Sequence, residues 1–148
     1  MKRIIARPLK SISTFSNIEQ LKQVRINAIK RGDLEFARMA QVRVWEILTE
    51  RAQTIDEKFL SIVQIYEDFL WEKNRKNTKA TRTRTKWIKD GTIKTASDIV
   101  RKNKSMGFDI LLEFEKLKYS IEQFVIDNAF MFEAKIVAIA RRKLTLAA

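Results

Sequence analysis

Residues that break helices are scarce in this chain and fall between its periodic segments. Its 148 residues include only three glycines, Gly32, Gly91 and Gly107, and one proline, Pro8. Because glycine and proline are the strongest local interruptions of a helix, their scarcity predicts long helices with few breaks. We therefore expect an all-α protein, a compact multi-helix domain of about seven or eight helices.

Helix starts are predicted from capping residues, whose side chains accept hydrogen bonds from the first free amides of a helix. Two capping boxes and one cap that follows a left-handed glycine stand out: Ser16 with Glu19, Thr54 with Glu57, and Asp33 after Gly32. They predict helices over about 16–31, 33–53 and 54–76, the first two forming an antiparallel hairpin. At helical spacing the inward side chains are expected to be Ile18, Leu21, Val24, Ala28, Leu34, Ala37, Val44, Leu48, Ile55, Phe59, Ile62, Tyr66 and Phe69.

The second half of the chain shows shorter periodic segments. They predict helices over 80–90, stopped by Gly91, over 95–103 with Thr95 as its cap, over 108–118, from Ser120 onward, and over 132–144, with a frayed tail after it. Two segments could instead be extended, 3–6 and the alternating 81–85, and we favour helix for the second. We expect one domain, 1–148, with an N-terminal arm (1–15), a three-helix part (16–76), a basic helical segment (75–106) and a C-terminal helical part (107–146).

Positive charge is concentrated in one part of the chain. Of a formal net charge of +12, residues 71–106 carry +9, with twelve Lys and Arg against three Asp and Glu. Residues 1–70 carry +3, and residues 107–148 carry no net charge. A helical surface normally mixes both signs, with pairs at i,i+4, and we interpret the central segment as an exception. The charge pattern therefore indicates a binding site within 71–106.

Spacing refines this prediction. If the helix over 80–90 extends back through Asn77, Arg75, Lys79, Arg82, Lys86 and Lys89 recur at spacings of four, three, four and three residues. Five like charges on one helix face repel one another, so the arrangement favours an anionic partner. Nucleic-acid phosphate is the commonest such partner. The predicted nucleic-acid-binding residues are Arg75, Lys79, Arg82, Arg84, Lys86, Lys89, Lys94, Arg101, Lys102 and Lys104 for phosphates, with Arg82, Arg84, Thr95 and Ser97 as candidates for reading bases.

The expected partner is nucleic acid, with DNA slightly favoured over RNA. A helical adaptor that binds an acidic protein is the alternative, and a solvated face or a membrane surface would also suit a basic patch.

A helix-turn-helix around Gly91 fits poorly, because Lys86 and Trp87 stand where its first helix needs small or apolar residues. Trp71 and Trp87 could stack on unpaired bases, although tryptophan at helical spacing is more often core. The oligomeric state is left open.

The chain lacks the residues on which most catalytic sites depend. The absence of His and Cys excludes thiol nucleophiles, imidazole triads and zinc sites built from these ligands. The glycine loops that cradle phosphates are also missing. We therefore expect no catalytic residue, no metal and no cofactor.

One short motif suggests a lesser alternative. Glu133 and Lys135, two residues apart, resemble the Glu-x-Lys half of the PD-(D/E)xK nuclease signature. The resemblance implies a Mg²⁺-dependent nuclease, with Asp109 or Asp127 as the second carboxylate. Helical periodicity over 132–144 argues against it, because on a helix the two side chains would point about 200° apart.

No segment of the chain is typical of a membrane or export signal. The basic N-terminal residues lack the apolar run of a secretory signal, and no stretch approaches the ~18–20 apolar residues that span a bilayer. We therefore expect no membrane insertion and an intracellular, cytoplasmic location, with which the lack of cysteine agrees.

Overall fold

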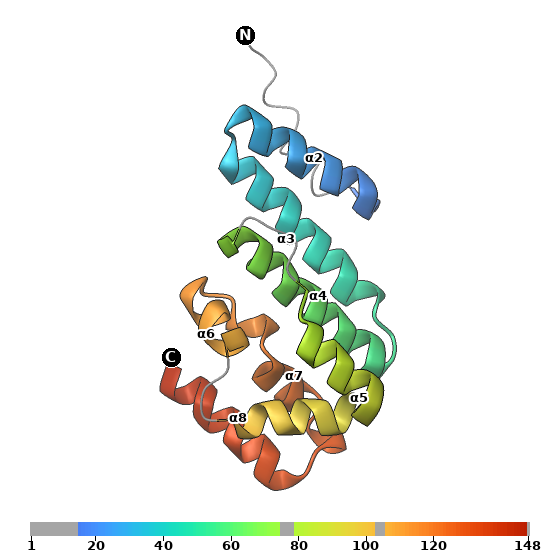
Figure 1. Ribbon diagram of the computed structural model, residues 1–148, viewed down its shortest axis with the longest axis vertical. Helices are drawn as coiled ribbons and strands as arrows, with labels where there is room; N and C mark the ends of the chain where they lie inside the picture. The colour runs from blue at the N-terminus through green and yellow to red at the C-terminus, as the bar shows by residue number, and fades with distance from the viewer. Residues whose placement is uncertain (1–14, 75–78, 103–105, 148) are drawn as a thin grey trace. The chain divides into compact units, whose positions relative to one another are not determined.

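The computed structural model describes residues 15–74, 79–102 and 106–147 (Figure 1). Every regular element in these ranges is helical, which confirms the all-α prediction. The elements are α2 (Ile18–Arg31), α3 (Leu34–Arg51), α4 (Ile55–Asn74), α5 (Thr81–Arg101), α6 (Met106–Glu113), the 3-10 turn η1 (Leu117–Tyr119), α7 (Ile121–Asp127), the 3-10 turn η2 (Ala129–Met131) and α8 (Ala134–Ala147). None of the described helices is both long and apolar enough to cross a membrane. The possible strand over 3–6 lies outside the described residues.

The chain forms two compact units, Met1–Gln53 and Thr54–Ala148. The helix over 54–76, which we grouped with the first two, therefore belongs with the C-terminal helices. Each unit has its own cluster of buried side chains.

The first unit contains the predicted hairpin of α2 and α3. α2 ends at Gly32, which has a left-handed φ of 81° and donates its N–H to carbonyls of the last turn. Asp33 caps α3, because its carboxylate accepts a hydrogen bond from the Phe36 N–H (3.1 Å). The predicted cap of α2 was wrong by one residue, since Asn17, not Ser16, accepts the Gln20 N–H.

The side chains between α2 and α3 largely follow the predicted stripe. Leu21, Ala28, Ala37 and Val44 are buried as expected. Leu34, the first residue of α3, is 59% exposed, so its predicted inward position was wrong. The structure buries instead Phe36, Ala40 and Ile47 of α3.

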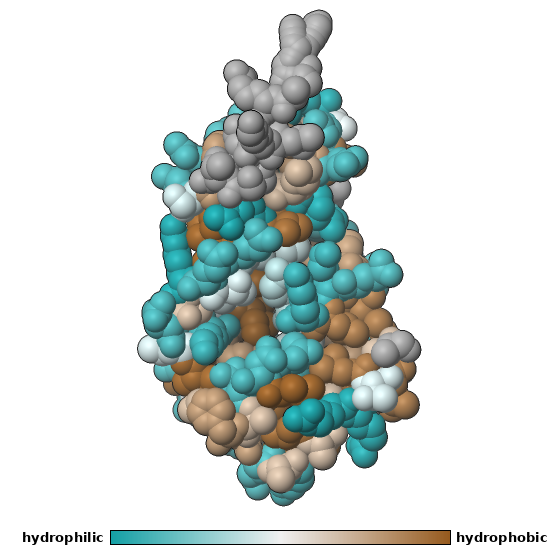
Figure 2. Space-filling model, turned by 180° about the vertical axis from the view of Figure 1, so that it is seen from behind, coloured by the Kyte–Doolittle hydropathy of each residue, from teal (hydrophilic) through white to brown (hydrophobic). Residues whose placement is uncertain are grey.

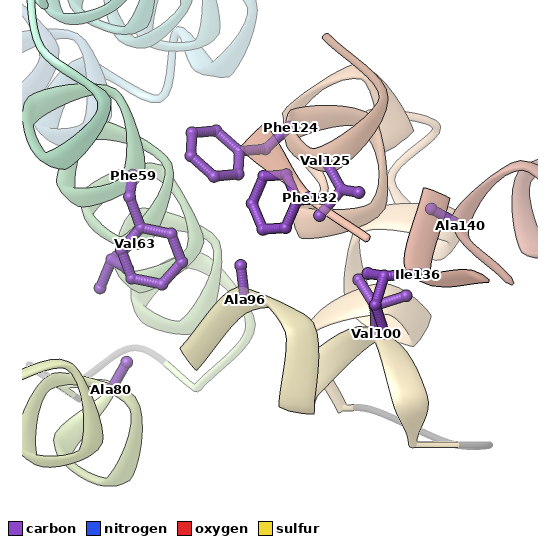
Figure 3. Close-up of a cluster of buried hydrophobic side chains, with 10 residues drawn as sticks. All are labelled: Phe59, Val63, Ala80, Ala96, Val100, Phe124, Val125, Phe132, Ile136 and Ala140. Carbon is purple, nitrogen blue, oxygen red and sulfur yellow. The ribbon is translucent and has the colours of Figure 1, made fainter. Parts of the chain in front are cut away.

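The core of the second unit joins four helices (Figure 3). Phe59 and Val63 come from α4, Ala96 and Val100 from the second half of α5, Phe124 and Val125 from α7, and Ile136 and Ala140 from α8, together with Phe132 and Ala80. The Phe124 ring stands edge-on to Phe59 and to Phe132, with centroid distances of 5.7 and 6.1 Å. The reciprocal capping box predicted at the start of α4 is present, with Thr54 and Glu57 exchanging hydrogen bonds.

Two predicted helix ends in this unit were wrong. The helix over 108–118 stops at Glu113, because Glu115 adopts a left-handed φ of 58° and the Lys116 N–H bonds to the Leu111 carbonyl. This closure normally uses glycine, so the sequence carries no sign of it. Ser120 then caps α7 as expected. The last helix begins at Ala134 and continues to Ala147, where a frayed tail was predicted.

Helix α5 is bent at Gly91, which has φ 85° and ψ 174°, and Figure 1 shows its two halves meeting at this bend. The predicted stop at Gly91 and the helical form of 81–85 are thus confirmed. Thr92, already helical, accepts a hydrogen bond from the Trp87 indole (2.8 Å) and donates one to Asp56 of α4. The second half therefore starts at Thr92, and the prediction of Thr95 as its cap was wrong.

The bend should be sensitive to any side chain at Gly91. A Cβ would meet no atom within 4 Å, so only the backbone conformation opposes alanine there. Because L-residues rarely adopt this conformation, Gly91→Ala should cost about 2 kcal/mol and lower the melting temperature by roughly 4–8 °C. Thermal unfolding followed by circular dichroism measures the effect. An unchanged melting temperature would show that the bend is not required.

Candidate functional site

The basic segment is tied to α4 by Glu67, which is 4% exposed. Its carboxylate accepts hydrogen bonds from Nε and Nη2 of Arg84, each at 2.7 Å, and from the Ala80 N–H at 2.8 Å. The Arg84 guanidinium thus donates to both carboxylate oxygens, and this bidentate geometry is the strongest for an arginine–carboxylate pair. Arg84, which we predicted as a phosphate contact, is engaged in holding the start of α5 against α4.

Burial and hydrogen bonding act in opposite directions on Glu67. Burial alone would raise its pKa, but the hydrogen bonds from Arg84 and Ala80, with the positive charges of Arg84 and Lys79, hold the pKa below its ordinary value. The same pairing raises the pKa of Arg84. Glu67 is therefore ionised at neutral pH. The ion pair of Glu67 with Arg84, which we call the clasp, remains intact there.

A second group of predicted cations surrounds Asp98. Its carboxylate lies 2.7 Å from Lys86 Nζ, 3.3 Å from Lys94 Nζ and 2.9 Å from Arg101 Nη1. Lys86 also pairs with Asp90 at 2.8 Å in the first half of α5, and its pair with Asp98 bridges the two halves across the bend at Gly91. Three of the predicted phosphate contacts are thus paired within α5 itself.

The hydrogen bond from Lys86, assisted by Lys94, lowers the pKa of Asp98 to about 2. Since this value lies below the ordinary 3.8, the pairing is complete above pH 3.8 and is lost as the pH falls towards 2. The interpretation of the segment as an exception to mixed helical charge was therefore wrong from Lys86 onward, where i,i+3 and i,i+4 pairs are present.

The remaining described cations between residues 75 and 106 are exposed and, within the part of the chain that the structure describes, make no ion pair. They are Lys79, Arg82, Lys89 and Lys102. Because α5 starts at Thr81, Lys79 precedes the helix, and the five-cation face was wrong as a single helical stripe. Arg75 and Lys104 lie outside the described residues.

Three of these four cations, Lys79, Arg82 and Lys102, line one cavity of about 500 Å³ in the second unit. Its walls come from α4, both halves of α5, α6 and the start of α7, and they are mainly apolar, with Ile62, Leu70 and Leu111 among them. Thr81 and Thr83 of the first turn of α5, which has no side-chain cap, complete the lining on the basic side. The cavity thus combines a mainly apolar lining with three cations that form no ion pair among the described residues.

Two predicted base-reading residues are inaccessible. Thr95 is completely buried and Ser97 is 8% exposed, because the second half of α5 packs this face into the core. The Thr95 hydroxyl has no hydrogen-bond partner among the described atoms, so it serves neither as a cap nor as a surface contact. We therefore do not keep either residue in the candidate site.

The structure also bears on tryptophan stacking and on the nuclease motif. The Trp87 N–H is bonded to Thr92, and the ring packs against the core.

Glu133 lies just before α8, so its carboxylate comes within 4.0 Å of Lys135 Nζ, where we expected the two to diverge. Glu133 also faces Arg101 at 3.6 Å. In the described ranges no three acidic side chains gather in a way that could hold a metal ion.

If Asp98 masks basic charge, its removal should strengthen binding to a polyanion. Asp98→Asn frees Lys94, whereas Arg101 keeps its pair with Glu133, and one added phosphate contact should tighten binding about fivefold at ~0.1 M salt. Fluorescence anisotropy with a labelled oligonucleotide measures the change. Asp127→Asn, on α7, makes the same charge change away from α5 and should have a much smaller effect. Equal gains from both variants would mean that only net charge matters.

Comparison with protein-family models, curated proteins and solved structures finds no match to this chain. A functional assignment therefore has to be argued from the chain's own residues.

Proposed function

We propose that this protein binds nucleic acid through the exposed cations Lys79, Arg82 and Lys102, with Lys89 as a further phosphate contact. The observation that carries the proposal is the separation of the basic segment into paired and unpaired charges. Arg84, Lys86, Lys94 and Arg101 form ion pairs with acidic side chains, whereas these four cations are exposed and form no ion pair with any residue that the structure describes.

Like charges that lie close together repel one another unless an anionic partner offsets them, and Lys79, Arg82 and Lys102 line one cavity. A phosphate backbone offers a row of single negative charges, which isolated Lys and Arg side chains match well. Thr81 and Thr83, beside Arg82, add hydroxyl groups that can donate to phosphate oxygens.

Binding should be measured with labelled 20-nucleotide strands of DNA and RNA, single and duplex, at 50 and 200 mM salt. Three to four phosphate contacts predict that affinity for a single strand falls roughly 20–50-fold between the two salt concentrations. Absence of binding at 50 mM salt, or an affinity independent of salt, would overturn the proposal.

The same experiment separates the competing adaptor function. Purification with nuclease, followed by mixing with an acidic polypeptide such as polyglutamate, tests for an acidic partner. Binding of polyglutamate with no binding of any oligonucleotide would replace the nucleic-acid proposal by the adaptor.

A further inference from the structure

The cavity between α4, α5 and α6 is lined by more than cations. Besides its cations it contains aromatic rings, Tyr66, Phe108 and Tyr119, and polar groups, Asn74 and Glu122. Its volume of about 500 Å³ is within the range of pockets that hold small organic ligands.

We propose that this cavity receives the base of one unpaired nucleotide, while Lys79, Arg82 and Lys102 hold the phosphates beside it. This inference rests on the proposed nucleic-acid binding and adds its substrate class, a single strand or a nucleotide with a free base. A base within a duplex is stacked and paired, so it could not enter a cavity of this kind.

The apolar and aromatic part of the lining suits a flat base. Aromatic side chains provide stacking surfaces that accept any base, and this is how many proteins bind single strands. Tyr66 and Phe108 are half-buried, so they are only partly covered by their neighbours. Ile62 and Ile99, from α4 and α5, supply apolar contacts.

The polar groups favour a base over an acyl chain. The Glu122 side chain is 2% exposed and is held by Lys143 through a single oxygen, Oε2, at 3.1 Å. The Tyr66 hydroxyl, whose pKa burial raises further above its ordinary value of 10.0, can donate a hydrogen bond at neutral pH. A base edge can pair with such groups and with Asn74, whereas a hydrocarbon would cover them without compensation.

The charge at the cavity completes the match. Lys79 lies just before α5, Arg82 in its first turn, and Lys102 directly after its last residue, so the bend in α5 brings both ends of the helix to one cavity. Three cations beside an apolar hollow complement a ligand with a phosphate at one end and a base at the other.

The test fills the cavity without changing its charge. Ile99→Phe places a larger side chain in the wall, and Ile26→Phe makes the same substitution at an exposed position of α2 in the other unit. Anisotropy is measured with a labelled 12-nucleotide single strand and with its duplex. A free nucleoside monophosphate, with inorganic phosphate as its control, is measured by isothermal titration.

The wild-type protein should bind the single strand about tenfold more tightly than the duplex, because a stacked base adds to the phosphate contacts. Ile99→Phe should abolish this preference and keep the duplex affinity, whereas Ile26→Phe should keep both. If Ile99→Phe lowers the melting temperature strongly, Ile62→Phe replaces it, in the part of the wall that α4 forms.

Equal wild-type affinity for single strand and duplex, or a preference that survives both folded cavity variants, would overturn the inference and leave the proposed function intact. If no oligonucleotide binds, the proposed function fails. Nucleoside monophosphate binding that Ile99→Phe abolishes and phosphate does not reproduce would still support the cavity assignment. If neither an oligonucleotide nor the nucleoside monophosphate binds, the cavity assignment is overturned too.

Discussion

Arg84→Met should destabilise the protein by about 3 kcal/mol at pH 7, because it leaves the Glu67 carboxylate buried without its charged partner. Methionine preserves the length and apolar stem of the side chain, so the loss reports mainly on the ion pair. Urea unfolding followed by circular dichroism measures the free energy. Arg142→Met, at an exposed position of α8 without a described ion pair, is the matched control and should change stability by less than about 0.5 kcal/mol.

The pH dependence of this loss distinguishes an ion pair from simple packing. In the wild type the pKa of Glu67 is depressed, so the clasp stabilises fully above the unfolded value of 4.5 and weakens as the pH falls through the lower folded value. In Arg84→Met burial dominates and raises this pKa. The variant should therefore recover part of its stability relative to wild type as the pH falls from 7 to 4.

The two partners of the clasp should differ in importance. Glu67→Gln leaves Arg84, whose side chain is 36% exposed, able to reach water, and the amide can still accept the Ala80 N–H. Its expected cost is therefore smaller, about 1–2 kcal/mol. Equal losses for the two variants, or a loss in Arg84→Met that does not change with pH, would contradict a buried carboxylate that depends on Arg84.

The second large effect concerns binding. The triple variant Lys79→Gln, Arg82→Gln and Lys102→Gln removes the three cations of the cavity. Each phosphate contact contributes roughly five- to eightfold at ~0.1 M salt, so their joint loss should weaken oligonucleotide binding roughly 100-fold. All three side chains are exposed, none forms an ion pair within the described residues, and Lys79 acts on Glu67 only through its charge, so the variant should remain folded.

A control of identical composition tests whether position matters. Lys30→Gln, Lys58→Gln and Arg142→Gln also removes two lysines and one arginine, all exposed and outside the basic segment. Net charge changes equally in the two triple variants. The control should weaken binding no more than about threefold, since screening at ~0.1 M salt limits the influence of charges that do not touch the ligand.

Local signals in the sequence predicted the helices and most of their starts. Asp33, the capping box of Thr54 with Glu57, and Ser120 act within three residues of the amides that they cap, so spacing alone identifies them. Gly91 was identified as a helix stop because the signal is the glycine itself, at the residue where the helix bends. The left-handed Glu115 had no such signal, because this position is not a glycine and the turn is closed by a backbone hydrogen bond from the Lys116 N–H to the Leu111 carbonyl.

The site was predicted less well, because ion pairing depends on the fold. Glu67 lies 17 residues before Arg84 and meets it only after α4 and α5 pack together. The bridge from Lys86 to Asp98 requires the bend at Gly91. The pairing of Asp98 with Lys94 and Arg101 was visible in the spacing, but counting net charge over the whole segment concealed it. The cavity has no sequence signal, since its walls come from separate helices.

The central claim is that a small set of unpaired cations binds phosphates. Its most direct test is the slope of the logarithm of the association constant against the logarithm of salt concentration, with a single-stranded 20-nucleotide oligonucleotide. The wild-type protein and the control triple variant should give a slope of about −2 to −3, as three to four phosphate contacts require. The cavity triple variant should give a slope nearer zero than about −1. A flat wild-type slope, or the same slope for both triple variants, would contradict the claim.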